Sequence, residues 1–339
     1  MRVDLTVGRA DARRRLDLVV HRLLTGPHRT TRARVQSFIR NGAVLVDGVE
    51  VRRPATRTSA GEVITVSLPE RGQRPASETT FDGAVDLTVD VIYEDEHLLV
   101  VDKPPGVVVH PTYRHATGTL LHALRRHARQ WPPSNRPSLV GRLDKATSGV
   151  VLVAKTRPVH AALQRILTGT ASQKDYLALV WGRVPARGAI AIPLARDPED
   201  RRRVAPVASG RTCLTRFERL ARVGTGRSAL ALLRCRLVTG RMHQIRVHLA
   251  ARGWPIVGDP VYGEPRWLHV SDPELRAVLQ RLPRQALHAW RLTFPHPISG
   301  VRLTCTARLP ADLAALVRAC RLEVAELGLG DVVSRGRWS

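Results

Sequence analysis

The sequence predicts an α+β protein: a mixed, largely antiparallel sheet with flanking helices, preceded by a small α/β domain. Two observations support this class. From residue 87 onward most apolar runs have the length and composition of strands, and several consecutive strands have no helical segment between them. A doubly wound parallel sheet needs a crossover between neighbouring strands, so this order argues against that class. We expect a small domain at 13–70, a linker at 71–86, a large domain at 87–318 and a tail at 319–339.

The small domain reads as two helices, a hairpin and one more strand. LDLVVHRLL (16–24) and TRARVQSFIRNG (31–42) each place apolar residues on one helical stripe, and Asn41-Gly42 ends the second helix. Asp47-Gly48 in AVLVDGVEVR predicts a tight hairpin turn, and GEVITVSL supplies the last strand. Four arginines flank the apolar face of the second helix: Arg29, Arg32, Arg34 and Arg40. They predict either an RNA-binding flank or an ordinary solvated helix face.

The linker and the large domain differ sharply in pattern. RGQRPASETTFDGA (71–84) has no apolar periodicity and is rich in Gly, Pro, Ser and Thr. The large domain then predicts strands at VDVIYEDEHLLVVDKP, SGVVLVAK, KDYLALVWGRV, SALALLRCRL, HQIRVHL (243–249) and VRLTCTARL, and helices at GTLLHALRRHA and PVHAALQRILTG. The end of the chain, from residue 320, reads as a helical or frayed tail.

The charge balance points to an anionic partner. The chain of 339 residues carries 54 Lys and Arg against 29 Asp and Glu, a net charge of +25. A field of this strength favours a polyphosphate backbone, with an anionic membrane surface as the competitor. No apolar run approaches the ~20 residues of a membrane span, and the N-terminal segment has no hydrophobic signal core. We therefore expect a cytoplasmic protein that binds nucleic acid and does not insert into a membrane.

The cysteines predict neither a metal site nor a disulfide framework. Cys213, Cys235, Cys305 and Cys320 are widely spaced, without a Cys-x-x-Cys pair. Small buried apolar residues are the simplest role for them.

Four separated segments of the large domain together resemble one family. They are HLLVVDKPPGVVVHP (97–111), GRLDKATSGVVLVAK (141–155), KDYLALVWG (174–182) and TGRMHQIRVHLAARGWPIVGDPVYG (239–263). In order and spacing they resemble the pseudouridine synthases of the RluA family, and LHAWRLTFPHPISG (287–300) extends the likeness. The small domain resembles the RNA-binding domain of ribosomal protein S-four.

The resemblance implies isomerisation of uridine to pseudouridine within structured RNA, with ribosomal RNA favoured over transfer RNA. The glycosidic bond breaks, the uracil rotates and it reattaches through carbon five, without redox change, so neither a cofactor nor a metal is expected. Nothing in the sequence indicates an obligate assembly, and a monomer is expected.

The resemblance also implies roles for four residues. Asp144 matches the catalytic aspartate, and an adjacent cation favours its charged form. Arg246, 102 positions later, matches the residue that pairs with this carboxylate, with a phosphate contact as the alternative. Tyr176 matches the tyrosine that stacks on the uracil, although a core role would explain it equally if it stood alone. Arg142 matches the position linked to base flipping, and in the absence of RNA it is expected to pair with Asp144.

Further residues near these motifs are expected to contact RNA: Lys145, Lys174, Arg241 and His243. His243 could be mistaken for a general base, and we expect a structural or RNA-contacting role instead. Lys103, Pro104 and Gly106 are expected to shape a loop near the site, and Gly258–Gly263 to form a rigid turn.

Two positions depart from the family pattern. Gly141 replaces a usual histidine, and Met242 replaces a usual Thr or Ser. An inactive RNA-binding or ribosome-assembly factor with the same fold therefore stays open as an alternative. A glycosidase that stops after bond cleavage is a weaker one, because no second carboxylate is evident as the general acid.

Overall fold

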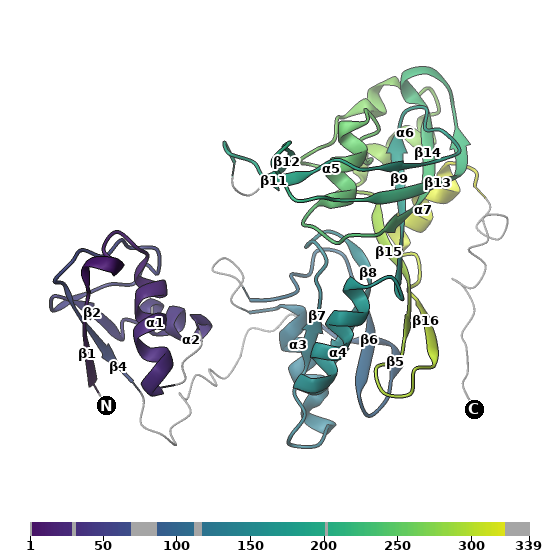
Figure 1. The fold of residues 1–339 in the computed structure, drawn as a ribbon. Coiled ribbons are helices and arrows are strands. Elements are labelled where there is room, and N and C mark those ends of the chain that lie inside the picture. Colours follow the sequence, from purple (N-terminus) through teal and green to yellow (C-terminus); the bar gives the residue numbers. More distant parts are fainter. Residues whose placement is uncertain (1, 29–31, 69–86, 112–116, 201–202, 323–339) are drawn as a thin grey trace. The chain divides into compact units, whose positions relative to one another are not determined.

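The computed structural model describes residues 2–28, 32–68, 87–111, 117–200 and 203–322. The chain divides into two compact units, residues 1–82 and residues 83–339, and each is described by itself (Figure 1). The predicted linker, 71–86, and most of the predicted tail, from residue 323, lie outside the described residues. No helix within the described ranges is long and apolar enough to cross a membrane.

The N-terminal unit contains the predicted pair of helices and the predicted hairpin. Its elements are β1 (Arg2–Thr6), α1 (Leu16–His28), α2 (Arg32–Arg40), β2 (Val44–Val46), β3 (Val49–Glu50) and β4 (Val63–Ser67). The strands form one antiparallel sheet in the order β1-β4-β2-β3. Asp47 and Gly48 have φ of 48° and 80°, the left-handed geometry that a two-residue hairpin loop requires. Strand β1 precedes the expected start of this domain at residue 13.

The larger unit is built on a mixed sheet of 10 strands. Its main path runs β10-β13-β14-β9-β15-β8-β6-β5, with β16 paired to β15 and β7 paired to β8. The strands are β5 (Asp90–Glu94), β6 (Leu98–Lys103), β7 (Ser138–Val140), β8 (Ser148–Ala154), β9 (Gln173–Trp181), β10 (Arg187–Ile190), β13 (Thr215–Val223), β14 (Leu230–Leu237), β15 (Leu287–Pro295) and β16 (Arg302–Thr306). Among these strands only β15 and β8 pair in parallel. The expected mixed, largely antiparallel sheet is therefore confirmed.

Strand β15 joins the two halves of this sheet by lying between β9 and β8 (Figure 1). The parallel pairing is short, Ser148 with His288 and Gly149 with Ala289. A Cβ on Gly149 would lie 2.1 Å from the carbonyl oxygen of Ala289, and its φ is +113°. Only glycine fits this close approach of the two backbones.

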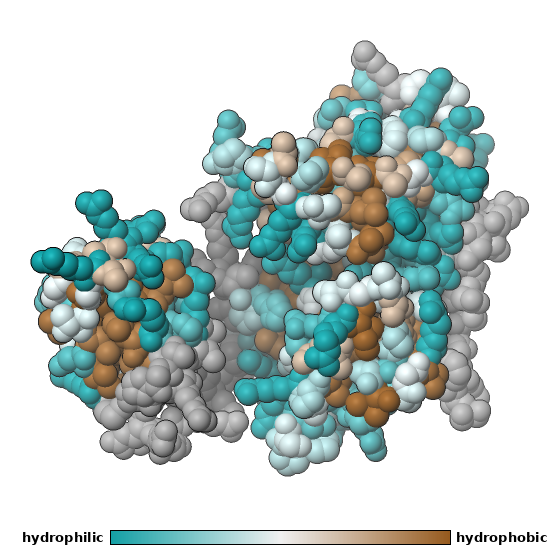
Figure 2. Space-filling model, viewed as in Figure 1, coloured by the Kyte–Doolittle hydropathy of each residue, from teal (hydrophilic) through white to brown (hydrophobic). Residues whose placement is uncertain are grey.

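Helices cover both faces of the sheet and enclose separate apolar clusters. They are α3 (Leu120–His127), α4 (Arg157–Thr168), α5 (Gln244–Ala251), α6 (Pro273–Arg281) and α7 (Ala311–Ala319). Helix α3 packs on the face of β6 and β8 that carries Leu99 and Val151, and α4 on the face that carries Val100 and Leu152. On the side of the unit shown in Figure 2, hydrophilic residues dominate the outline and hydrophobic residues gather toward the middle.

The expected strand at HQIRVHL (243–249) is wrong, because these residues form helix α5. Ile245, Val247 and Leu249 alternate as they would in a strand, but every residue from 244 to 249 is buried. Short apolar runs are ambiguous between a strand and a buried helix. The polar members are fully engaged: His248 lies 2.9 Å from the Thr215 hydroxyl and 3.0 Å from the Ile192 carbonyl oxygen. Tertiary packing on β13 therefore overrides the local pattern.

Candidate active site

Asp144 lies in the loop between β7 and β8, and this loop is fixed through its backbone. The Thr147 amide donates to the Asp144 carbonyl at 3.1 Å. Lys103 donates to the Lys145 carbonyl at 3.1 Å, and Arg284 donates to the Ala146 carbonyl at 3.1 Å. Donors from β6 and from the segment before β15 thus hold the residues that follow the carboxylate.

The two cations that hold this loop are themselves buried. Lys103 is 0% exposed and also donates to the carbonyls of Pro104 and Val107, at 2.8 and 3.0 Å. Burial lowers the pKa of Lys103 to about 7, and the charge of Arg284 acts in the same direction. Arg284 is bound through two hydrogen bonds, of 2.6 and 2.9 Å, to Asp312 of α7. The Lys103 loop is therefore shaped as expected, by a lysine that caps three carbonyls.

Gly141, which departs from the family pattern, has φ of +92° and no atom within 4 Å of the position of a Cβ. This backbone conformation favours glycine, and no steric constraint adds to it. In this chain, therefore, the departure agrees with the conformation that the loop adopts.

Arg246 joins Asp144 to a second carboxylate that the sequence analysis did not single out. Its Nη1 donates to Asp144 Oδ2 at 3.0 Å, while Nε and Nη2 donate to the two oxygens of Asp259 at 2.7 and 2.8 Å. Asp259 Oδ1 also accepts from the amides of Val261 and Tyr262. Burial opposes the charge of Asp259, but the hydrogen bonds from Arg246 lower the pKa of Asp259 below its ordinary value. Asp259 therefore fixes the guanidinium of Arg246 through two hydrogen bonds, and a third N–H group of Arg246 binds Asp144.

The carboxylate of Asp144 keeps one oxygen available. Its side chain is 23% exposed, and Arg246 binds Oδ2. No hydrogen bond from the described residues reaches Oδ1. Asp144 thus keeps one oxygen free of hydrogen bonds from the described residues, at a pocket that it lines, while the buried Arg246 binds the other oxygen.

His243 approaches the same carboxylate from the start of α5. Its φ of 55° and ψ of 15° are left-handed, a conformation that is uncommon for residues other than glycine and is often found at functional sites. Its Nδ1 lies 3.0 Å from the Tyr262 hydroxyl, which already accepts from the Val204 amide. The phenol has one proton and more than one lone pair, so either group can be the donor in the contact with Nδ1, depending on the tautomer of the ring. Nε2 lies 3.7 Å from Asp144 Oδ2, too far for a hydrogen bond.

The charge state of His243 follows from its surroundings. Burial lowers the pKa of His243, the charge of Asp144 opposes this effect, and the charges of Arg246 and Arg142 add to it. The net effect lowers the pKa and so favours the neutral ring, which lines the pocket beside Asp144 without a hydrogen bond to it.

A cavity of about 840 Å³ connects these groups, within the ~300–1,000 Å³ range that is typical of ligand pockets. The expected catalytic residues Asp144, Tyr176 and Arg246 all line it. Burial raises the pKa of Tyr176 above its ordinary value, and the charge of Asp144 adds to this rise. The phenol therefore stays protonated at neutral pH.

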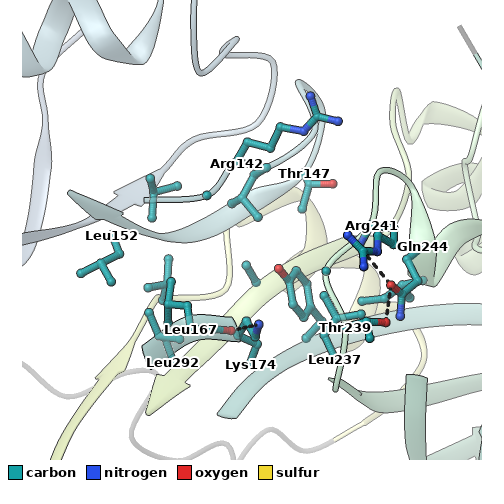
Figure 3. Close-up of a pocket in the computed structure, with 18 of the residues that line it drawn as sticks. Arg142, Thr147, Leu152, Leu167, Lys174, Leu237, Thr239, Arg241, Gln244 and Leu292 are labelled. Atoms are coloured by element: carbon teal, nitrogen blue, oxygen red, sulfur yellow. Dashed lines mark hydrogen bonds between the residues drawn. The ribbon is translucent and has the colours of Figure 1, made fainter. Parts of the chain in front are cut away.

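Figure 3 shows how the pocket is divided. Arg142 and Thr147 lie on the wall formed by the Asp144 loop, and Thr239, Arg241 and Gln244 lie across from them. The Gln244 oxygen accepts from the Thr239 hydroxyl at 2.9 Å and from the Arg241 amide at 3.0 Å. Leu152, Leu167 and Leu292 form an apolar end, where Lys174 donates to the Leu167 carbonyl at 2.7 Å.

The predicted basic residues of the larger unit separate into two groups. Arg142, Lys174, Arg241 and His243 line the pocket, whereas Lys145 does not and contributes its backbone oxygen to Lys103. The expected pairing of Arg142 with Asp144 is wrong, because among the described residues the carboxylate pairs with Arg246. The Arg142 side chain is exposed. Arg142 stays exposed because Arg246 already supplies the positive charge that pairs with Asp144.

The arginines of the N-terminal unit have mixed roles. Arg32 and Arg15 both bind Asp17, whose side chain is 0% exposed, at 2.9 Å. Burial opposes the ionisation of Asp17, yet hydrogen bonds from Arg15, Gln36 and Arg32 lower the pKa of Asp17 to about 2. Arg32 therefore ties α2 to α1, with its side chain 47% exposed. Arg40 is exposed at the end of α2.

The other two predicted N-terminal arginines are not placed. Arg29 lies outside the described residues, and the Arg34 side chain is not described although its backbone belongs to α2.

Sequence reasoning missed three residues that support the pocket. Asp259 and Tyr262 lie in the segment that was expected to be only a rigid turn, and Arg284 precedes the motif LHAWRLTFPHPISG. A carboxylate and a tyrosine within a turn were the available signal for the first two. For Arg284 there was none, because a single arginine among so many carries no information.

The sheet thus brings a carboxylate, an arginine and a half-buried tyrosine to one pocket, and comparison with known proteins assigns this arrangement to the pseudouridine synthase class. A family model described as RNA pseudouridylate synthase matches residues 97–251. The fold is similar to that of human RNA pseudouridylate synthase domain containing 4, with a TM-score of 0.55, 23% identity and coverage of 69% of this chain and 94% of that chain.

Curated relatives are similar over nearly the whole chain. Ribosomal large subunit pseudouridine synthase D of Nitrosomonas europaea is 40% identical over 319 residues, covering 94% of this chain and 88% of the relative. The protein of the same name from Neisseria meningitidis serogroup B is 38% identical over 324 residues, covering 95% and 83%. The chain belongs to the RluA family of RNA pseudouridine synthases.

Proposed function

We propose that this protein converts a uridine of large-subunit ribosomal RNA to pseudouridine, with Asp144 as the reacting carboxylate. One observation carries the proposal: Arg246, fixed by Asp259, binds one oxygen of Asp144 and leaves the other without a hydrogen bond from the described residues, at a pocket that Tyr176 also lines. The names of the relatives support ribosomal RNA as the substrate.

The reaction requires the target base to leave the RNA helix and enter the pocket. Arg142 is exposed at the pocket wall and has no ion pair among the described residues, so its planar guanidinium is available to fill the vacated place in the base stack. The Tyr176 ring then stacks on the uracil, and Asp144 Oδ1 reaches the sugar. Both attack on the sugar and proton abstraction from it would use this same oxygen.

The protonated state of Tyr176 restricts its role. Because burial and the Asp144 charge both raise its pKa, the phenol acts as a stacking surface and a hydrogen-bond donor at neutral pH. His243 also lines the pocket and supplies a second polar contact to the uracil.

The N-terminal unit is proposed to capture structured RNA as an S-four-like module, with Arg40 as an exposed contact. RNA binding dominated by phosphates weakens steeply as salt rises, with a slope of about −0.9 in log K against log salt per contact to a duplex. We further propose that the protein acts in the cytoplasm as a monomer.

The test is chemical mapping of pseudouridine on total RNA incubated with purified protein. The wild type is expected to create a new pseudouridine, and Asp144→Asn and Asp144→Ala to create none while retaining RNA affinity. Asp4→Asn is the matched control, because Asp4 is an exposed carboxylate of β1, in the N-terminal unit. Full conversion by either Asp144 variant would refute the assignment of this residue. If the wild type modifies no RNA of its source organism, the chain is instead an RNA-binding or ribosome-assembly factor.

A further inference from the structure

Three arginines lie in one row across four neighbouring strands of the larger unit. The strand register pairs Arg216 of β13 with Arg236 of β14, Arg236 with Asp175 of β9, and Asp175 with Arg291 of β15. These strands are neighbours in the sheet (Figure 1). Since neighbouring strands lie ~4.8 Å apart, the row spans about 14 Å.

One carboxylate holds this row in place. Asp175 is 3% exposed, and Arg236 binds it through two hydrogen bonds of 2.7 and 3.1 Å. Arg291 approaches the same carboxylate at 3.7 Å, and its guanidinium lies 4.2 Å from the centre of the Trp290 ring. Two of the guanidinium groups are thus held in fixed positions while 38% and 30% of their side chains remain exposed.

The row carries more positive charge than its carboxylate can neutralise. Arg216 is exposed and has no ion pair among the described residues, although it lies directly opposite Arg236. Like charges directly opposite each other on adjacent strands are destabilising. In the next row the only carboxylate, Glu218, is paired with Arg234, while Arg187 on β10 adds another exposed cation. An anion bound along the row would remove this repulsion.

The row lies on the face of the sheet opposite the reacting groups. Tyr176 lines the pocket, and Asp175 and Arg291 also border it, but alternation along β9 directs the side chains of Tyr176 and Asp175 to opposite faces of the sheet. The register places Tyr176 opposite Cys235, which is buried, and Asp175 opposite Arg236. Arg216 and Arg236 do not line the pocket, so an anion that contacts them is not the nucleotide that enters it.

We propose that Arg216, Arg236 and Arg291 bind the phosphodiester backbone of the substrate RNA outside the segment that enters the pocket. Phosphates along one strand rise ~3.4 Å each along a duplex axis, so the 14 Å row faces about four of them. Arginine suits this role because its fork binds phosphate through two N–H groups. The inference rests on the proposed function, since it concerns the same RNA.

The test combines Arg216→Gln with Arg291→Gln in the full chain. Arg236 is kept so that Asp175 retains its hydrogen-bonded partner and the fold is preserved. Affinity for a transcript of large-subunit ribosomal RNA is expected to fall about 25-fold, five-fold per exposed arginine. The magnitude of the salt slope should decrease by about 2, one unit for each lost contact. Turnover at saturating RNA should stay within two-fold of the wild type, because Arg216 lies outside the pocket and the Arg291 guanidinium contacts Asp175 and Trp290 and not Asp144.

Arg222→Gln is the matched control, an exposed arginine of the same strand, β13, that lies outside the row. It should leave affinity within two-fold. An equal loss in the control would show that only net charge matters and would overturn the proposal. Unchanged RNA affinity of the double variant would also overturn the proposal. The same holds if the double variant loses binding only to vesicles of anionic lipid and not to RNA. A short stem-loop around the modified uridine should bind the wild type and the double variant with equal affinity, because it does not reach the row. Failure of the proposed function is distinct, because the wild type would then form no pseudouridine at all.

Discussion

Replacing Arg246 with lysine tests whether the shape of this cation, and not only its charge, is required. The guanidinium spans two carboxylates with three hydrogen bonds, two to Asp259 and one to Asp144. A lysine ammonium is a point charge that cannot reproduce this fork. If it stays with Asp259, whose side chain is 0% exposed, the contact with Asp144 is lost. One hydrogen bond between charged groups contributes about 1.5–3 kcal/mol.

This loss predicts a decrease in kcat/KM of roughly 10- to 150-fold, at 1.36 kcal/mol for each factor of ten. The free energy of unfolding should fall by a similar amount, about 1.5–3 kcal/mol, because Asp259 also loses one partner in a buried site. Release of tritium from carbon five of labelled uridine in RNA measures the rate, since that carbon loses its hydrogen on isomerisation. Urea denaturation measures the stability.

Arg236→Lys is the matched control. Arg236 binds the buried Asp175 with the same two-bond geometry, but on the opposite face of the sheet. It should lose a comparable amount of stability and keep kcat within two-fold. The reasoning is refuted if Arg246→Lys retains kcat within two-fold, or if both variants lose kcat equally.

Three further predictions concern other groups of the larger unit. Arg142→Ala should lower kcat on structured RNA about 10-fold or more while leaving stability unchanged, because its exposed side chain acts only when RNA is bound; equal kcat with the wild type would contradict this. His243→Gln keeps a polar group near the position of Nε2 and should retain activity within about five-fold, whereas His243→Leu should lose about 10- to 100-fold; equal activity of the two variants would contradict a polar contact of this side chain with the substrate. Burial raises the pKa of Asp102 to about 7, and the charge of Asp90 adds to the rise. The folded state therefore holds this proton where the unfolded state has released it, and stability contributed by Asp102 is lost as pH rises from about 4 to 7. The change in the free energy of unfolding that Asp102→Asn causes should be more stabilising at pH 8 than at pH 4, by at most about 4 kcal/mol. Urea denaturation at both pH values measures this change. The same change at both would contradict a raised pKa of Asp102.

Local pattern was sufficient for much of this fold. Alternation and β-branched composition located β6, β8, β9 and β14, and the predicted α3 and α4 appear with nearly the expected bounds. These segments satisfy packing and local preference together, so their sequences specify them without tertiary information. Helix α5 failed because its environment is buried on every side, which removes the polar face that identifies a helix.

Strands β10 and β13 escaped prediction for a different reason. Arg187–Ile190 and Thr215–Val223 mix exposed arginines with few apolar residues. Their place in the sheet is set by their neighbours, since strand preference depends strongly on such context.

The residues of the candidate site that the family resemblance implies were predicted from the sequence. The residues that support them through side-chain geometry were not. Asp144, Tyr176 and Arg246 meet at the pocket as expected. The support from Asp259, Tyr262 and Arg284 depends on side-chain directions that no spacing rule provides, because each lies far along the chain from Asp144. Arg142 was expected to pair with Asp144 because the two are close in sequence. In the structure Asp144 pairs with Arg246 instead.

The placement of β15 has a consequence for the order in which a growing chain becomes an enzyme. Asp144 precedes β8, and Tyr176 lies on β9. Strand β15, which lies between β8 and β9 in the sheet, is synthesised more than 100 residues after Tyr176. A nascent chain that stops before Leu287 has both reacting groups but lacks the strand that sets their separation. Activity therefore arises late in translation, when almost the entire larger unit has been made, and not when the motif that carries the aspartate leaves the ribosome.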